Sequence, residues 1–375
     1  MKKIIFVTGT RADYGKMKSL IKYLQKKKLF KVFVFITGMH NLKKFGSTWE
    51  VLKKDKIRNK YRYNNQKLGD SMDIILSKTI LGFGKFVKKI KPDLIIIHGD
   101  RIETLACAIV GSLNNFKTAH IEGGEVSGAV DEILRHSISK LCHVHFVTNN
   151  IARKRLIQMG EVKKNIFIIG SPDVDIIKSK QLPTITEVKK RYNIKFSEYA
   201  VAIFHPVTTE LEKLRKNCKI FIKAILESNT NYVIIWPNND TGSEIILEEY
   251  QNIKSNENIK IFPSMRFEYY LTLLKNSHFI IGNSSSGIME APYYGVPTIN
   301  IGNRQNNRTN LKTINNCNFS YFEIKKLINK FKYRKIRYYL NFRFGYGKSF
   351  QYFNEILNKK EIWKISTQKQ FQDIN

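Results

Sequence analysis

Acidic side chains gather in one glycine-broken stretch of an otherwise basic chain. Residues 120–136, HIEGGEVSGAVDEILRH, contain the four acids Glu122, Glu125, Asp131 and Glu132. A carboxyl group can remove a proton and return it, and carboxyl groups that share a pocket raise one another's pKa. We therefore expect Glu122 and Asp131 to transfer protons. We interpret Glu125 and Glu132 as acids of the surface or of a helix start.

A third acid that fits this chemistry follows an apolar run. Asp100 comes soon after Leu94–Ile97 in LIIIHGD. The ends of adjacent parallel strands lie roughly 5 Å apart, so Asp100 and Glu122 would share one pocket, which Asp131 would enter from the loop beyond. The alternative interpretation is that Asp100 caps the helix that follows, and the two roles do not exclude each other.

Two cations follow the first apolar run, in TGTRADYGK. Arg11 and Lys16 would reach an anionic group at the start of a helix, where backbone NH groups also favour negative charge. The glycine spacing differs from the GxGxxG pattern of dinucleotide sites. The alternative is an ordinary strand–helix turn with two surface cations.

The second half of the chain has a different polar set at its strand ends. His205 ends the apolar run in AIFHPVT, and GNSSSGIMEAP follows a later run. The hydroxyls and glycine of that loop would open a helix that holds a diphosphate, with Glu290 one or two turns on, placed for both hydroxyls of a ribose. A serine-rich helix cap with a solvated glutamate is the alternative. The residues that open the helix are Ser284, Ser285, Ser286 and Gly287.

Strands that alternate with helices must position these side chains. Apolar runs of strand length recur through the chain, separated by stretches of helical spacing such as residues 17–24. The pattern predicts an α/β fold of two Rossmann-like, doubly wound domains, each with a parallel sheet. A polar stretch broken by Pro183 marks the boundary. We place the N-terminal domain at 1–178, the C-terminal domain at 179–345 and a final helix at 346–375.

The composition narrows the classes of function. The chain of 375 residues has 64 Lys and Arg against 31 Asp and Glu. This excess recurs along the whole chain, so we interpret most of it as a basic surface and not as a nucleic-acid site. The first apolar run is too short for a signal peptide, and no run is long enough to span a bilayer. Because the four cysteines are scattered without a CxxC pair, we expect a cytoplasmic protein with no disulfide, metal, membrane or nucleic-acid partner.

Six motifs, taken together and in order, resemble the UDP-N-acetylglucosamine 2-epimerases over nearly the whole chain. They are GTRADYGK, HGDR, HIEGGE, DEILRH, HPVT and NSSSGIMEAP…GVPTINIGNRQNNR. They resemble the hydrolysing branch, which supplies N-acetylmannosamine for sialic acid synthesis. The resemblance implies two Rossmann-like domains in the glycosyltransferase-B arrangement with a central cleft, and a C-terminal helix that crosses back to the first domain. It also implies a UDP-sugar substrate, a homodimer and no cofactor, neither metal nor nicotinamide.

The resemblance further implies a reaction and roles for residues. UDP leaves C1 as a proton leaves C2, which gives 2-acetamidoglucal; water then adds at C1, and C2 is reprotonated on its other face. Asp100, Glu122 and Asp131 match the family's catalytic acids, and the order of proton removal and return stays open. His205, a fourth catalytic candidate, matches a histidine near the diphosphate. The matches to the family's substrate contacts are Arg11, Lys16, Ser285, Ser286, Gly287, Glu290 and Arg308.

The chain departs from the family motifs at two places, and three other functions are alternatives. Asp131 stands where non-hydrolysing relatives carry Glu, which fits the hydrolysing branch, and the family's late YGDG pattern is FGYG at 344–347. One rival is a hydrolysing 2-epimerase of nucleotide-linked diacetylbacillosamine, for legionaminic acid synthesis. The others are a glycosyltransferase of the same fold and a basic nucleic-acid-binding protein. The clustered acids argue against the last two, because neither needs proton transfer at C2.

Overall fold

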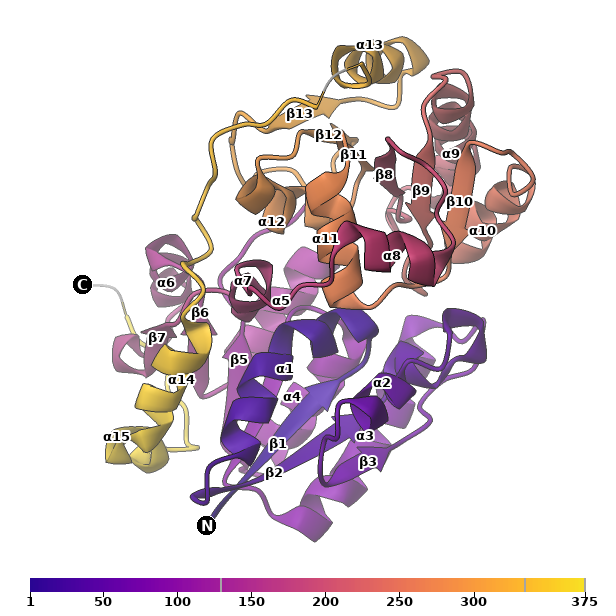
Figure 1. Cartoon of the computed structure of the whole chain (residues 1–375). Helices are drawn as coiled ribbons and strands as arrows, with labels where there is room; N and C mark the ends of the chain where they lie inside the picture. Colours follow the sequence, from indigo (N-terminus) through magenta and orange to yellow (C-terminus); the bar gives the residue numbers. More distant parts are fainter. Residues whose placement is uncertain (129, 334, 374–375) are drawn as a thin grey trace. The chain divides into compact units, whose positions relative to one another are not determined.

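A computed structural model of the chain describes residues 1–128, 130–333 and 335–373 (Figure 1). They form two compact units. The first unit comprises Met1–Glu125, Asp131–Lys178 and Arg343–Asn375, and the second comprises Val126–Val130 and Ser179–Phe342. The predicted domain limits made no provision for Val126–Val130, in which the backbone NH of Gly128 donates to the carbonyl of Arg304 (3.0 Å).

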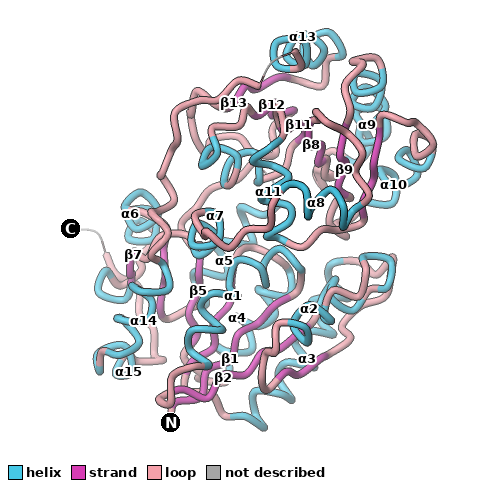
Figure 2. Tube along the Cα trace, viewed as in Figure 1, coloured by secondary structure: helices cyan, strands magenta, loops and turns pink. Residues whose placement is uncertain are grey.

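The first unit is built on a sheet of seven parallel strands in the order β3-β2-β1-β4-β5-β6-β7. Figure 2 draws its strands in magenta, with β1, β2 and β5 labelled. The strands are β1 (Lys2–Thr8), β2 (Phe30–Ile36), β3 (Lys60–Arg62), β4 (Leu94–His98), β5 (Thr118–Ile121), β6 (Val144–Val147) and β7 (Ile166–Ile168). Ile4 and Phe6 pack into one core cluster, and Ile5 and Val7 into another, because a parallel sheet is covered on both faces. The strand order reverses between β1 and β4, and ligands of doubly wound sheets bind at the carboxyl ends of strands at such a point.

The helices of this unit flank the sheet. They are α1 (Arg11–Gln25), α2 (Trp49–Lys54), α3 (Met72–Ile90), α4 (Ile102–Leu113), α5 (Val130–Leu141), α6 (Asn150–Gln158), α7 (Pro172–Ile177), α14 (Ser349–Asn358) and α15 (Lys360–Lys364). The prediction of one final helix is wrong, because two short helices, α14 and α15, occupy this part of the chain. α14 packs Phe353 against Phe146, with 4.8 Å between the ring centroids. Asp175 accepts the backbone NH groups of Ser349 and Phe350 at the start of α14 (2.9 Å each).

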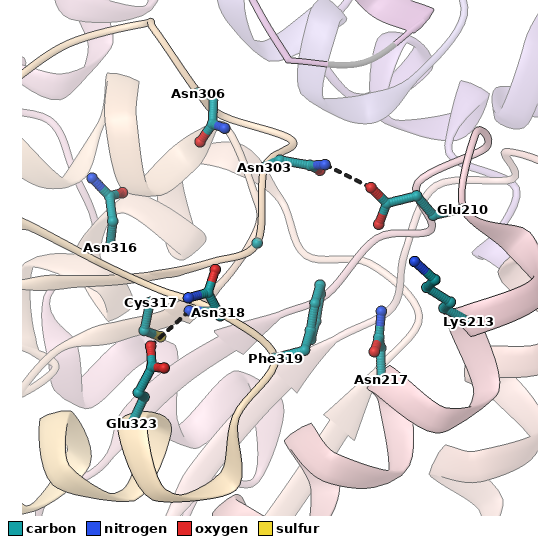
Figure 3. A pocket seen from close by; sticks show the side chains of 11 residues that line it. Glu210, Lys213, Asn217, Asn303, Asn306, Asn316, Cys317, Asn318, Phe319 and Glu323 are labelled. Carbon is teal, nitrogen blue, oxygen red and sulfur yellow. Dashed lines mark hydrogen bonds between the residues drawn. The ribbon is translucent and has the colours of Figure 1, made fainter.

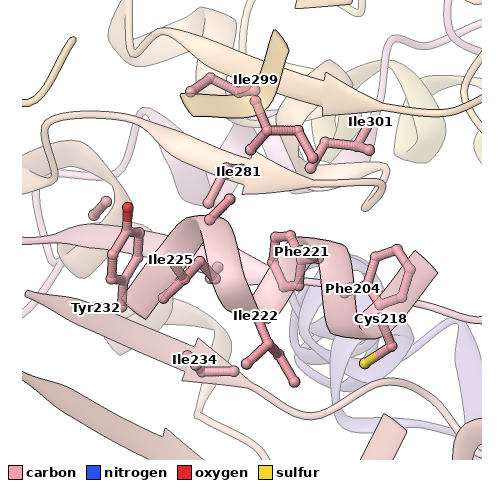
Figure 4. Packing of buried hydrophobic residues seen from close by; sticks show 14 of the residues in the cluster. Phe204, Cys218, Phe221, Ile222, Ile225, Tyr232, Ile234, Ile281, Ile299 and Ile301 are labelled. Atoms are coloured by element: carbon pink, nitrogen blue, oxygen red, sulfur yellow. The ribbon is translucent and has the colours of Figure 1, made fainter. Parts of the chain in front are cut away.

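The second unit repeats the design with six parallel strands in the order β10-β9-β8-β11-β12-β13. Its strands are β8 (Ala200–Ile203), β9 (Tyr232–Ile235), β10 (Ile259–Phe262), β11 (Ile280–Gly282), β12 (Thr298–Ile301) and β13 (Ile314–Cys317). Its helices are α8 (Ile185–Tyr192), α9 (Leu211–Leu226), α10 (Ser243–Gln251), α11 (Phe267–Asn276), α12 (Ser286–Met289) and α13 (Tyr321–Phe331). Phe221 and Ile225 of α9 share a buried cluster with Ile281 and Ile299 of the sheet (Figure 4). The order reverses here between β8 and β11, so this unit has its own predicted ligand edge.

No helix within the described ranges has both the length and the apolar character that crossing a bilayer requires.

Candidate active site

The carboxyl ends of β4 and β5 carry two of the predicted acids. His98 and Ile121, the last residues of these strands, are register partners in the parallel ladder. Asp100 lies two residues beyond the first and Glu122 one residue beyond the second. The two acids therefore lie at neighbouring strand ends, on the edge of the sheet where its strand order reverses.

Arg135, on α5, connects these acids. Its guanidinium forms a short ion pair with Asp100, lies 3.7 Å from a carboxylate oxygen of Glu122 and donates to the Glu122 carbonyl at 3.0 Å. Burial lowers the pKa of Arg135, but Asp100, Glu122, Glu125 and Asp131 together outweigh burial and raise it. One buried cation thus interacts with all three predicted catalytic acids. The sequence analysis quoted Arg135 in DEILRH but gave it no role, because an arginine inside an amphipathic helix looks like a surface residue.

The structure tests one interpretation of Asp100, that it caps the helix after β4. The residue that caps the start of α4 is Arg101, and its side chain makes no capping hydrogen bond. Asp100 instead forms its ion pair with Arg135, and about a quarter of its side chain is exposed (24%). The alternative that Asp100 caps this helix is therefore wrong.

Glu122 is buried among cations. One carboxylate oxygen lies 3.0 Å from Nε2 of His98 and 4.0 Å from Nζ of Lys16, and the other faces Arg135. Burial raises the pKa of Glu122, but Lys16, His98 and Arg135 outweigh burial and hold it well below its usual range. Our prediction that the clustered acids raise one another's pKa is wrong for Glu122, because its carboxylate faces Lys16, His98 and Arg135.

The backbone at Glu122 is also unusual. Its φ of +70° lies in the left-handed region that side chains other than glycine seldom adopt. The conformation is held by hydrogen bonds, from the Glu122 NH to the Phe146 carbonyl (3.1 Å) and from Arg135 to the Glu122 carbonyl (3.0 Å). Backbone strain that the surroundings enforce clusters at functional sites.

Lys16 bridges two acids, one of which the sequence analysis missed. Besides Glu122, its ammonium lies 3.5 Å from Asp173, whose side chain is 1% exposed. Asp173 is near the start of α7, and the only sequence signal was its place in SPDVD, shortly after the last strand of the first sheet. Through the Lys16 ammonium, the buried carboxylate of Asp173 belongs to the same electrostatic network as Glu122.

The start of α1 differs from the anion site that we predicted. Thr10 caps the helix, and the Asp13 side chain accepts the NH groups of Gly9 (2.9 Å) and Thr10 (3.2 Å). These backbone donors are thus occupied by a residue of the chain itself. Arg11, the first residue of the helix, lies near His40; burial first, and then Arg11, lower the pKa of His40 to about 3.

Glu125 was expected at the surface, and that expectation is wrong. It is 1% exposed, and the Thr148 hydroxyl and the Asn149 amide donate to its carboxylate. Glu132 is more exposed and pairs with His136 one turn later (3.0 Å).

In the second unit, Asn283 organises the strand ends around His205. The side chain of Asn283 accepts from the His205 NH (2.7 Å) and donates to the His205 carbonyl (2.8 Å), which joins the ends of β8 and β11. The Asn238 NH donates to Nδ1 of His205 (3.2 Å), so Nε2 bears the proton of the neutral ring. Arg304 and Gln305 donate to the Asn283 carbonyl (3.3 and 3.1 Å). The sequence analysis missed Asn283 and Arg304, since nothing in their spacing sets them apart.

The serine loop, residues 284–287, opens a shorter helix than we predicted. α12 comprises only Ser286–Met289, and a 3₁₀ turn with Pro292 follows. Glu290 caps the end of this single turn and so lies within the predicted one or two turns. It is buried, so the alternative of a solvated glutamate is wrong. The Ser286 hydroxyl is hydrogen-bonded to Tyr270, and a Cβ at Gly287 would lie 2.5 Å from Thr298, so the loop packs tightly on β12.

Arg308 lies close to this loop. It is buried, donates to the Gln305 side chain (3.1 Å) and contacts the sulfur of Met289 (3.6 Å). Since Gln305 also donates to the Asn283 carbonyl, Arg308 and His205 belong to one hydrogen-bonded network. The second unit thus brings together His205, Arg308 and the serine loop around neutral amides.

A further cavity, of about 500 Å³, opens in the second unit beyond the ends of β12 and β13 (Figure 3). Its wall is rich in asparagine; the Asn303 amide donates to Glu210 (2.6 Å), and the Asn318 NH donates to Glu323 (3.0 Å). The part of the wall that the structure describes does not include the serine loop. The cavity is therefore distinct from the predicted nucleotide residues.

Comparisons with known proteins point to one family. A family model described as UDP-N-acetylglucosamine 2-epimerase matches residues 22–358. The UDP-N-acetylglucosamine 2-epimerase of Neisseria meningitidis serogroup B is 43% identical over 377 aligned positions that cover 100% of both chains. The UDP-N,N'-diacetylbacillosamine 2-epimerase (hydrolyzing) of Legionella pneumophila is 34% identical over 348 positions, 90% of this chain and 91% of that one.

A solved structure extends the likeness to the fold. The crystal structure of the UDP-GlcNAc 2-epimerase from Neisseria meningitidis bound to UDP-GlcNAc matches with a TM-score of 0.77 at 19% identity, over 95% of this chain and 99% of that one. Together with the two parallel sheets, this match confirms the predicted α/β class with two Rossmann-like domains of the glycosyltransferase-B type.

Proposed function

The chain belongs to the UDP-N-acetylglucosamine 2-epimerase family, and we propose that it hydrolyses UDP-N-acetylglucosamine with inversion at C2. Water is consumed, and the products are N-acetylmannosamine and UDP. The observation that carries the proposal is the arrangement of Asp100 and Glu122 around buried Arg135, in a chain 43% identical over its full length to the Neisseria enzyme. Because N-acetylmannosamine is a precursor of sialic acids, we assign the reaction to sialic acid biosynthesis.

In the proposed mechanism, the first unit moves protons. The C2 proton leaves with the departure of UDP from C1, and the electrons of the broken C–H bond form the C1–C2 double bond of 2-acetamidoglucal. Water then adds at C1, and a proton is delivered to C2 on the opposite face. Such steps need acid and base groups held around one sugar ring.

The electrostatics distinguish the acids. Glu122 is kept ionised by its cations, so it acts as a proton acceptor and not as a donor. Asp100 and Asp131 are then the candidates for returning a proton to C2. Arg135 balances the charge of the group, so that the acids can lie close together without repelling one another.

The second unit is proposed to hold the nucleotide. Nε2–H of His205 would donate to the diphosphate, and Arg308 would add a positive charge nearby. Ser284, Ser285, Ser286 and Gly287 would contact the phosphates, and Glu290 the ribose hydroxyls. Arg11 and Lys16 are proposed as further substrate contacts, since a cation would offset negative charge on the leaving group.

The test is proton NMR of the purified protein with UDP-N-acetylglucosamine in deuterated water. The expected products are UDP and N-acetylmannosamine that carries deuterium at C2. Epimerised sugar still joined to UDP would move the protein to the non-hydrolysing reaction. Release of UDP without deuterium at C2 would instead favour a transferase-like or simple hydrolytic cleavage.

A second candidate substrate is nucleotide-linked diacetylbacillosamine, since the Legionella relative named for it is 34% identical. The higher identity to the Neisseria enzyme favours UDP-N-acetylglucosamine. Competition between equal concentrations of the two UDP-sugars measures the preference directly. A kcat/KM higher for the diacetylated sugar would reverse the assignment.

We also propose that the chain acts as a homodimer, as its family resemblance implies. Light scattering of the purified protein would give twice the chain mass of 43.8 kDa. A mass of one chain under conditions of full activity would contradict this.

A further inference from the structure

His120 is the first histidine of the acid-rich stretch, and the proposed mechanism assigns it no role. It lies on β5, two residues before Glu122, and is 0% exposed. Its Nε2 lies 2.8 Å from the Gly99 carbonyl oxygen, and its Nδ1 lies 2.9 Å from the Ser139 hydroxyl. Both ring nitrogens therefore have partners, and these partners come from two other segments.

The partners determine where the proton of His120 resides. A carbonyl oxygen can only accept, so Nε2 carries the hydrogen and donates it to Gly99. Nδ1 is then the acceptor, and the Ser139 hydroxyl donates to it. Burial, followed by the charges of His145, Arg135 and His98, lowers the pKa of His120 well below its usual value, although the bond to Gly99 opposes this. The ring is thus a neutral connector.

The two contacts of His120 reach the segments that carry the other acids. Gly99 immediately precedes Asp100. Ser139 lies on α5 at a spacing of four residues after Arg135 and eight after Asp131, so the three side chains share one face of that helix. Glu122 lies two residues after His120, just beyond the end of β5. His120 therefore links three segments: β5, the turn that follows β4, and α5.

We propose that His120 is the positioning residue that holds the segments of Asp100, Glu122 and Asp131 in a common register for proton transfer. The proposal rests on the proposed function and adds a residue that need not touch the substrate. A neutral ring suits this role, since a charged one would add a cation to acids that already face Arg135, Lys16 and His98. Proton transfer is sensitive to displacements of well under an ångström.

The packing around the ring leaves little freedom. A Cβ at Gly123 would lie 2.8 Å from the Ser139 hydroxyl and 2.9 Å from Nδ1 of His120. These distances are shorter than van der Waals contact, so the glycine after Glu122 is needed for the His120–Ser139 contact. Gly123, one of the two glycines that interrupt the acid-rich sequence, thus leaves room for the His120 imidazole beside the acids.

The experiment compares Ser139→Ala with His120→Gln. Ser139→Ala removes the hydroxyl that orients the ring, and we expect kcat to fall about tenfold with KM and UDP affinity within about twofold, as for one lost hydrogen bond that acts on the chemical step. His120→Gln keeps an NH donor for Gly99 and should retain more activity than His120→Ala. Ser228→Ala is the matched control, because it deletes another buried hydroxyl, in the second unit, and should leave kcat unchanged.

A second readout is independent of turnover. Nitrogen-15 NMR of histidine-labelled protein should show His120 as the neutral Nε2–H tautomer throughout pH 5 to 9. The opposite tautomer, or a titration within that range, would overturn the proposal even in a fully active enzyme. So would a Ser139→Ala variant whose kcat is unchanged, or whose only loss is a lower folded fraction. If the wild type fails to convert UDP-N-acetylglucosamine, the proposed function falls, and the variants are then compared on the diacetylbacillosamine substrate.

Discussion

The two candidate regions achieve order in opposite ways. Around Asp100 and Glu122, the first unit relies on buried charges, with Arg135, Lys16 and His98 as counterparts. Around His205, the second unit is centred on a neutral residue, Asn283, whose amide bonds the His205 backbone and whose carbonyl accepts from Arg304 and Gln305. Charged networks suit a site where protons move, because ionisation states can be tuned there. Neutral networks suit a site that only has to bind, because they hold a shape across a wide pH range.

The largest expected effect tests the charged region. Glu122→Gln removes the proton acceptor but keeps its size, so kcat should fall about 10³-fold, within the usual range for losing a general base. UDP affinity, measured by calorimetry, should change little, since the second unit is proposed to hold the nucleotide. The exposed Glu248→Gln is the control. Retention of full deuterium exchange at C2 would remove Glu122 from the mechanism.

Next in size is the stability that depends on Arg135. Arg135→Met leaves Asp100 and Glu122 without their shared cation, and such broken buried pairs cost about 3 kcal/mol of unfolding free energy. Urea denaturation of both proteins measures this difference. Arg215→Met removes an exposed arginine that also bridges two glutamates, and it should change stability little. Equal losses for the two variants would show that burial does not distinguish the regions.

A change in the network around His205 and Asn283 should affect the binding of UDP. Asn283→Ala leaves the buried NH and carbonyl of His205 without their hydrogen-bond partner. The Kd for UDP should therefore rise about tenfold, while the rate of deuterium exchange per bound substrate stays near that of the wild type. Asn231→Ala, which removes an exposed amide that donates to the Glu198 carbonyl, is the control. A fall in kcat with unchanged UDP affinity would place Asn283 with the charged region instead.

The smallest effect concerns pH. The pKa of Glu122 is held well below its usual 4.5, so its proton-accepting form is present above that lowered pKa and is lost only as pH falls through it. The acidic limb of kcat/KM due to Glu122 should therefore lie below pH 4.5. Lys16→Met removes the cation that lowers this pKa most, and the limb should move to higher pH. Lys18→Met, which affects the Asp55 pair, should leave the limb in place. UDP binding should show no matching shift.

Local patterns in the sequence were sufficient for much of the fold. Apolar runs such as Ile4–Val7 and Leu94–Ile97 indicate buried parallel strands. A strand that is covered on both faces is apolar at every position, whereas a strand with one face in water alternates apolar and polar residues. Chain order then placed Asp100 and Glu122 at strand ends. The serine loop was less predictable: the sequence indicated where a helix begins but not its length, since Pro292 and the packing of Gly287 on β12 stop α12 after one turn.

The sequence by itself thus determined the elements, their alternation and the acids at the strand ends, since these follow from interactions between near neighbours. Only the tertiary structure decided the partners. Arg135 reaches Glu122 from α5, Asp173 reaches Lys16 from α7, and His120 contacts the Gly99 carbonyl beside Asp100. Glu125 is buried through a contact with Thr148. The sequence does not show whether a charged side chain contacts water or a buried counter-ion. Its pKa and its role depend on which distant segment the fold packs against it.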